Sequence, residues 1–208
     1  MKIFVRIVGI IAVLAVIGLG WAANYFYNYA VVPSEKDFLD NDTPGTSKVE
    51  TKEVDRWYSD ENLRTRWSLE SQDGLNLSAI YIPAEKNNHK TAIIAHGYMG
   101  SAETMGEYAK MYHDFGYNVL VPDARGHGQS EGDYIGFGWH ERKDYLQWID
   151  RVLAENGADE TITLYGLSMG AATVMMVSGE DLPKNVVSII EDCGYSSINA
   201  ELQYQLKE

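Results

Sequence analysis

The sequence predicts an α/β fold in which a mostly parallel sheet carries helices on both faces. Polar and apolar residues alternate on both sides of Asp73-Gly74, a pattern that predicts a β-hairpin. After the hairpin, short apolar runs alternate with segments of helical periodicity. Repeated strand–helix units build a parallel sheet, because each helix returns the chain to the edge where the previous strand began. The 208 residues, 45% of them hydrophobic, suffice for one such domain and an appendage.

The appendage is the N-terminal segment. Ile7 to Ala23 is a run of 17 uncharged residues after Lys2 and Arg6, at the short end for a membrane-spanning helix. Residues 35–61 are rich in acidic side chains and hold only four basic ones. The positive-inside rule therefore predicts a cytoplasmic N-terminus and an extracytoplasmic remainder. A cleaved signal peptide is the alternative, but Trp21 is too bulky for a small-residue cleavage site, so we favour an uncleaved signal anchor.

These features divide the chain into a transmembrane signal anchor at residues 1–23, a stalk at 24–60 and a globular domain at 61–208. The stalk is polar and lacks sustained periodicity, although residues 54–58 begin a short helix. A single-pass tether without a disulfide framework favours a protein of a bacterial cell membrane.

Within the domain, the predicted strands and helices alternate. The predicted hairpin strands are 64–70 and 75–82, and the apolar runs at 91–95, 117–121, 161–165 and 186–190 predict further strands of the sheet. Helical periodicity marks residues 103–115, 139–153, 171–177 and 198–206.

Residues 166–170 form the pentapeptide Gly-Leu-Ser-Met-Gly, a G-x-S-x-G pattern between a predicted strand and a predicted helix. This context predicts a nucleophile elbow, a turn so tight that the residues two before and two after Ser168 must be small. The turn lifts the serine hydroxyl above the sheet. It also places the next N–H group at a helix N-terminus, where it can bind an oxyanion.

Two further motifs follow predicted strands. His96-Gly97-Tyr98-Met99-Gly100 follows the run at 91–95, and the segment from Asp123 to Ser130 follows the run at 117–121. In parallel sheets the ligand site lies at the carboxyl ends of the strands, where both motifs and the elbow are expected. We interpret His96 as a hydrogen-bonding brace, and Asp123 with Arg125 as a structural ion pair.

In this order, the three motifs resemble those of the α/β-hydrolase family, in its serine-aminopeptidase and lysophospholipase-like branch. The resemblance covers about residues 64–200. It implies an α/β-hydrolase fold with Ser168 as nucleophile and the backbone N–H groups of Tyr98 and Met169 as oxyanion hole. Asp192, at the end of the strand after the elbow, is a weaker candidate for the triad acid.

The expected triad lacks a histidine. In this fold a histidine follows the serine and the acid in chain order, but the last histidine is His140. Without further strands, the run at 186–190 would also be left as an exposed apolar edge of the sheet. We therefore expect a C-terminally truncated, membrane-anchored serine hydrolase, which would cleave an ester, thioester or amide through an acyl-serine intermediate at Ser168. The alternatives are a non-catalytic binding protein, or an acyltransferase with the same serine chemistry.

Composition excludes several other classes. A net charge of −13 argues against a nucleic-acid partner. The single cysteine, Cys193, permits no internal disulfide and is expected to be buried. We expect no cofactor, because the sequence shows neither a phosphate loop nor metal-ligand spacing. The expected partners are a small-molecule, lipid or peptide substrate and the membrane.

Overall fold

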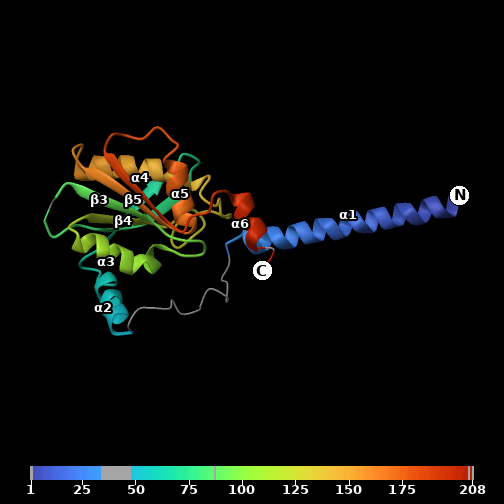
Figure 1. Ribbon diagram of the computed structural model, residues 1–208, viewed down its shortest axis with the longest axis horizontal. Coiled ribbons are helices and arrows are strands. Elements are labelled where there is room, and N and C mark those ends of the chain that lie inside the picture. The colour runs from blue at the N-terminus through green and yellow to red at the C-terminus, as the bar shows by residue number, and fades with distance from the viewer. Residues whose placement is uncertain (1, 34–47, 87, 206, 208) are drawn as a thin grey trace.

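A computed structural model places a six-stranded sheet between two helical layers, with one long helix projecting from the domain (Figure 1). It describes residues 2–33, 48–86, 88–205 and 207. Residues 34–47 of the predicted stalk and residue 206, the predicted end of the final helix, lie outside these ranges.

The strand order in the sheet is β1-β2-β4-β3-β5-β6. The hairpin is confirmed, and its second strand joins the sheet antiparallel to β4. The other pairings, β4–β3, β3–β5 and β5–β6, are parallel, so the sheet is mixed, with parallel pairing only from β4 to β6. The strands are β1 (Thr65–Glu70), β2 (Asn76–Ile82), β3 (Lys90–Ala95), β4 (Asn118–Pro122), β5 (Thr161–Leu167) and β6 (Val186–Asp192).

Helices lie on both faces of the sheet (Figure 1). α2 packs against α3 on one face, and α4 packs against α5 on the other. The predicted helix at 103–115 begins as a short 3-10 turn, η2, before α3 continues it. The bounds are α2 (Lys48–Tyr58), η2 (Ala102–Met105), α3 (Gly106–Asp114), α4 (Glu141–Asn156), α5 (Met169–Val177) and α6 (Ile198–Gln205).

The central strands β3 and β4 carry the core. Four consecutive residues of β3 before Ala95, and every residue of β4, are buried. Alternate side chains enter the two helical layers: Ile93 packs with Trp148 of α4, whereas Ile94 packs with Met105 of η2. A continuous apolar run therefore serves both faces, as predicted for central strands of a parallel sheet.

α2 belongs to the packed structure although it lies within the predicted stalk. Tyr58 at its end is buried, and its hydroxyl donates to the carbonyl of Ala102 at 2.7 Å. Burial raises the pKa of this phenol, which therefore stays protonated and acts as a donor.

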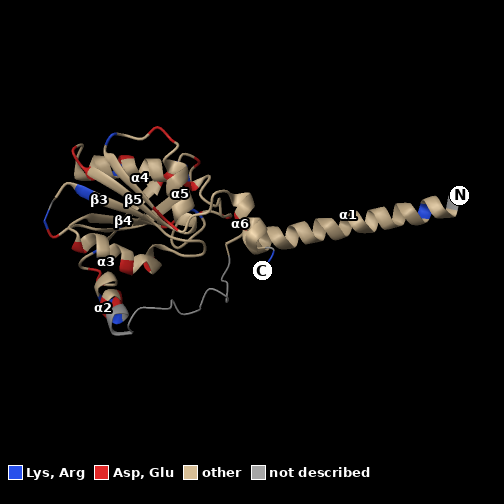
Figure 2. Cartoon of the chain, viewed as in Figure 1, with Lys and Arg blue, Asp and Glu red and all other residues tan. Residues whose placement is uncertain are grey.

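α1 (Lys2–Ala30) is the projecting helix. It continues past the predicted span of residues 7–23, and Ile3–Ala30 is long and apolar enough to cross a membrane. Its charged residues lie only at the N-terminal end (Figure 2). A membrane anchor and a signal sequence both have a helix of this kind near the N-terminus.

The last strand lies at the sheet edge. Val187 of β6 is 63% exposed and Ile190 is 41% exposed, which matches the predicted apolar edge. Cys193, just after β6, is exposed as well, so the prediction that it is buried is wrong. The reason is positional: the loop after an edge strand has protein on one side only.

Candidate active site

Ser168 occupies a strained turn between β5 and α5. Its backbone angles are φ 54° and ψ −113°, outside the usual regions for a residue with a side chain. Such a conformation costs on the order of 1–3 kcal/mol and persists only where the surroundings enforce it. Here the N–H of Ser168 donates to the carbonyl of Asp192 at 2.8 Å, which ties the turn to the end of β6.

The glycines of the pentapeptide are sterically required. A Cβ atom on Gly166 would lie 2.2 Å from the carbonyl oxygen of Gly170. A Cβ on Gly170 would lie 2.2 Å from the carbonyl oxygen of Ala95, the last residue of β3. The expectation of small residues at both positions is confirmed, and backbone atoms cause the restriction in each case.

The loop after β3 lies beside the nucleophile. A Cβ on Gly97 would stand 3.5 Å from the Cβ of Ser168. Tyr98 follows, and then Met99 with φ 57°. In the part of the chain that the structure describes, the N–H groups of Tyr98 and Met169 donate to no protein acceptor. Both donors are therefore available to a developing oxyanion, and the Met169 N–H lies in the first turn of α5, where the helix dipole is positive.

His96 braces this loop, as predicted. Its Nε2 accepts from the N–H of Ala124 at 3.0 Å, and its Nδ1 lies 2.8 Å from the carbonyl oxygen of Gly97. Burial lowers its pKa to about 4, so the ring is neutral at pH 7. With both ring nitrogens engaged, His96 cannot take a proton from Ser168.

His127 is a second brace, which the sequence analysis did not single out. Its Nε2 accepts from the N–H of Met99 at 3.3 Å and its Nδ1 lies 3.1 Å from the carbonyl oxygen of Arg125. Burial lowers its pKa. The ring centroid is 5.0 Å from that of His96. The sequence feature that could have indicated this role is the position of His127 between two glycines in the segment 123–130.

The Asp123 carboxylate joins the two loops. It accepts from the N–H of Ala102 at 2.6 Å, from the N–H of Gln129 at 3.1 Å and from the guanidinium of Arg66 at 3.0 Å. The fold leaves it little room, because a Cβ on Gly128 would lie 2.1 Å from a carboxylate oxygen. Asp123 therefore positions backbone at both loops.

The predicted ion pair between Asp123 and Arg125 is wrong. Arg125 is buried and instead contacts Asp144 of α4 at 2.7 Å and Asp73 of the hairpin turn at 2.7 Å. These contacts hold the pKa of Asp73 well below its usual range. Sequence proximity was misleading because successive residues after a strand point in different directions, toward η2 for Asp123 and toward α4 for Arg125.

The surroundings of Ser168 are apolar. Met169 is buried with Ala124 and Ile135, and four partly buried side chains pack against them: Tyr98, Met99, Phe137 and Tyr195. The rings of Tyr98 and Phe137 stack at 5.7 Å. The motif side chains Tyr98, Met99 and Met169 therefore contribute to an apolar cluster beside the nucleophile.

Asp192 lies where the sequence analysis placed it, at the end of β6. Its carboxylate accepts from the hydroxyl of Tyr165 at 2.8 Å. Among the described residues, no histidine contacts this carboxylate or Ser168. The role of Asp192 as triad acid stays a prediction.

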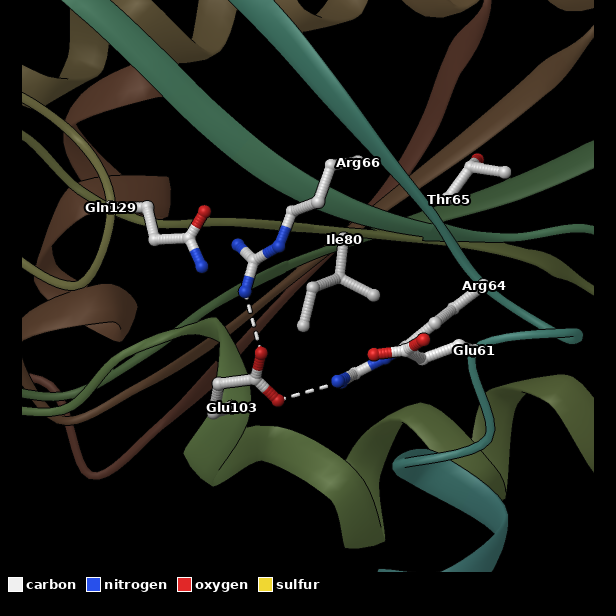
Figure 3. Close-up of a pocket in the computed structure, with 7 residues that line it drawn as sticks. All are labelled: Glu61, Arg64, Thr65, Arg66, Ile80, Glu103 and Gln129. Atoms are coloured by element: carbon white, nitrogen blue, oxygen red, sulfur yellow. Dashed lines mark hydrogen bonds and ion pairs between the residues drawn. The ribbon is translucent and has the colours of Figure 1, made fainter.

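A polar cavity of about 320 Å³ lies at another part of the sheet (Figure 3). There the Glu103 carboxylate bridges Arg64 and Arg66 at 2.6 and 2.5 Å, so the two cations are compensated within the cavity wall. None of the predicted catalytic residues lines it.

Comparison with known families gives one clear match. The family described as "Serine aminopeptidase, S33" matches residues 86–199, more than half of the chain, including all three motifs. The uncharacterized protein YqkD of Bacillus subtilis (strain 168) is 25% identical over 196 residues, covering 94% of this chain. The thermostable monoacylglycerol lipase of Bacillus sp. (strain H-257) is 29% identical over 119 residues, 55% of this chain. The chain spans 62% and 42% of the lengths of these two relatives.

Solved structures support the fold. The Pyrococcus furiosus esterase Pf2001 superposes with a TM-score of 0.61 at 23% identity. The match covers 81% of this chain and 63% of that esterase. At this identity the likeness establishes the α/β-hydrolase fold.

Proposed function

Because this chain belongs to the serine aminopeptidase S33 family of α/β hydrolases, we propose that it acts as a membrane-anchored serine hydrolase of acyl esters, with Ser168 as nucleophile. The observation that carries the proposal is the strained Ser168 turn, with two backbone N–H groups that have no protein acceptor in the described part of the chain, one on the next residue, Met169, and one on Tyr98 of the adjacent loop. Strain of this kind is maintained at positions where geometry matters for chemistry. The lipase among the relatives favours an ester of a fatty acid as the substrate class.

The proposed reaction has two steps. The Oγ of Ser168 attacks the ester carbonyl carbon and loses its proton to a general base, while the carbonyl oxygen becomes an oxyanion bound by the N–H groups of Tyr98 and Met169. The C–O bond to the alcohol then breaks, and the alcohol leaves with the proton. Water attacks the acyl-serine in the same way and releases the acid. Losing one oxyanion donor typically costs about 3 kcal/mol of barrier.

The general base is the part of this reaction that the described residues do not supply. Both nearby histidines, His96 and His127, use their ring nitrogens to hold backbone groups. In a longer protein, a histidine beyond residue 208 would complete the triad in the chain order that the fold uses. Asp192 is the weaker candidate for its acid partner, because its carboxylate already accepts from the hydroxyl of Tyr165.

The proposed anchor is α1, with the N-terminus in the cytoplasm and the domain outside. The apolar composition of Ile3–Ala30 supports this, as do the basic residues Lys2 and Arg6 at the N-terminal end of the helix. The stalk and domain boundaries at residues 24–60 and 61–208 are part of the same proposal.

Hydrolysis of a short water-soluble ester tests the proposal. The full-length protein, purified in detergent, should release p-nitrophenol from p-nitrophenyl acetate, and Ser168→Ala should remove that activity. Ser178→Ala is the matched control, because Ser178 lies at the other end of α5. Equal rates for the protein and its Ser168→Ala variant would contradict the proposal.

A further inference from the structure

The end of α1 contacts the loops that surround Ser168. The hydroxyl of Tyr98 donates to the carbonyl of Ala30 at 2.8 Å. The N–H of Ile135 donates to the carbonyl of Val31 at 2.8 Å, and a Cβ on Gly126 would lie 3.0 Å from Cγ of Pro33. In Figure 1, α1 approaches the domain from the side where α6 lies. Residues 30–33 thus touch the loop after β3 at one point and the long connection between β4 and α4 at two points.

Tyr98 couples this contact to the chemistry. Its hydroxyl binds the helix end, its ring stacks on Phe137, and its own N–H is a proposed oxyanion donor. Burial raises the pKa of the phenol, so it remains a donor at neutral pH. A shift of the helix end relative to the domain would therefore reach the oxyanion loop through one side chain.

The length of α1 sets the distance between the site and the lipid. Seven residues separate Ala23, the last residue before the polar Asn24, from Ala30, which at 1.5 Å per residue is about 10 Å. The headgroup layer on one side of a bilayer is about 5–8 Å thick. The contact with Tyr98 therefore falls close to the outer edge of the headgroups.

Aromatic side chains mark the same level of the helix. Exposed rings cluster in the last turns of α1 before the contact, and those of Trp21, Tyr25 and Tyr29 stack along the helix. Tyrosine and tryptophan are enriched where a helix leaves the hydrocarbon. We expect these rings to fix how deeply α1 lies in the bilayer. Because the helix is continuous to Ala30, the same depth sets the height of the site above the bilayer.

We propose that the docked end of α1 holds the active site against the membrane surface, so that the enzyme takes its acyl ester from the bilayer in which it is anchored. This inference rests on the proposed function. The apolar cluster of Met169, Ile135, Phe137 and Tyr195 lies beside Ser168 and suits an acyl chain that leaves the lipid. A tethered site meets esters in its own membrane at a high effective concentration, whereas esters in another membrane must first transfer.

The test compares two arrangements of one substrate. In the shared arrangement, full-length protein is reconstituted in phosphatidylcholine vesicles that also contain a two-chain fluorogenic acyl ester. In the separate arrangement, vesicles that contain only the protein are mixed with vesicles that contain only the ester. Two chains keep the ester from exchanging between vesicles. We expect the rate in shared vesicles to exceed the rate in separate vesicles by at least about tenfold, from the effective concentration of tethered partners.

Two insertions isolate the docked helix end. The first places ten Gly and Ser residues directly after Asn24. This flexible linker has an average end-to-end distance of about 17 Å, so it lets the domain move away from the bilayer surface while residues 30–33 stay attached to the domain. The same insertion placed directly after Pro33 leaves the helix continuous up to its contact. We expect the first insertion to bring the shared-to-separate ratio toward one, and the second to leave it unchanged.

Tyr98→Phe tests the coupling, because it removes the hydroxyl that binds Ala30 and keeps the ring. We expect turnover of the vesicle ester to fall several-fold more than turnover of p-nitrophenyl acetate. Equal shared and separate rates, with Ser168-dependent turnover of p-nitrophenyl acetate intact, would overturn this inference alone. Absence of Ser168-dependent turnover with both substrates would overturn the proposed function as well.

Discussion

The elbow and the oxyanion loop lie side by side, but they are held in place in different ways. At the elbow, five consecutive residues and the backbone of β3 determine the geometry, since Gly166 and Gly170 each leave no space for a side chain. At the loop, the positions of Tyr98 and Met99 depend on partners remote in sequence. His127 and Ala30 each hold one of its residues, and Asp123 holds the turn that follows.

Residues close in sequence therefore determine the position of the nucleophile. The position of the Tyr98 N–H depends instead on contacts between segments that are remote in sequence. A change at the elbow should remove activity by misplacing Ser168. A change at the braces should weaken activity by loosening Tyr98. The variants below separate the two regions, from the largest expected effect to the smallest.

Gly170→Ala should have the largest effect. Its new Cβ would approach the carbonyl of Ala95 to 2.2 Å, so backbone must move and we expect a loss of at least about 3 kcal/mol of stability together with loss of activity. Gly179→Ala is the matched control, because its Cβ would meet its nearest neighbour at an ordinary 3.5 Å. Urea unfolding and ester hydrolysis measure both effects. A stable and active Gly170→Ala variant would show that the elbow is not sterically fixed.

Asp123→Asn should weaken the oxyanion loop without moving Ser168. The amide retains one acceptor oxygen for the three donors that the carboxylate now satisfies, so we expect a loss of about 2–3 kcal/mol of stability. Asp114→Asn removes an exposed ion pair with Lys110 and should cost less than about 0.5 kcal/mol. Urea unfolding measures both. Equal losses for the two variants would contradict a bracing role for Asp123.

His96 predicts a pH dependence of stability. Because its folded pKa, about 4, is below the ordinary value of 6.5, the unfolded chain takes up the proton first as the pH falls. Stability should therefore decrease from pH 6.5 toward pH 4 by about 1 kcal/mol per unit from this group, and His127 acts in the same direction.

The His96→Gln variant should flatten this slope between pH 6.5 and pH 5, as measured by urea unfolding at each pH. The His140→Gln variant serves as control, because His140 is exposed at the start of α4. An unchanged slope in His96→Gln would contradict the role of burial at this ring.

Asp192→Asn should have the smallest effect. Its carboxylate accepts from Tyr165, and an amide oxygen can do the same, so we expect ester hydrolysis by the full-length protein to fall by less than about tenfold. A loss near the roughly 10⁴-fold that accompanies removal of a triad acid's charge would instead assign Asp192 that role directly.

The sequence predicted the locally encoded features well. Every strand of the sheet was expected close to its observed bounds, because period-two alternation and apolar runs depend on nearby residues. The elbow glycines were predicted for the same reason, and their steric restriction is confirmed.

The features that were missed depend on long-range contacts. The pairing of Arg125 with Asp144 and Asp73 joins the loop to α4 and to the hairpin turn. The bond from Tyr98 to Ala30 links residues 68 positions apart. Neither contact produces a periodic pattern in the sequence, since each depends on how the folded helices, strands and loops pack together. The exposed Cys193 was missed because edge position is a property of the whole sheet.

The most direct test of the central claim is to map the adduct of a fluorophosphonate on the full-length protein extracted from membranes. Tryptic peptides would be sequenced by mass spectrometry, with Ser168→Ala processed in parallel. We predict a single modified serine, Ser168, and no adduct in the variant. An unmodified Ser168, or an adduct on another serine that persists in the variant, would contradict the assignment of the elbow as the reactive centre.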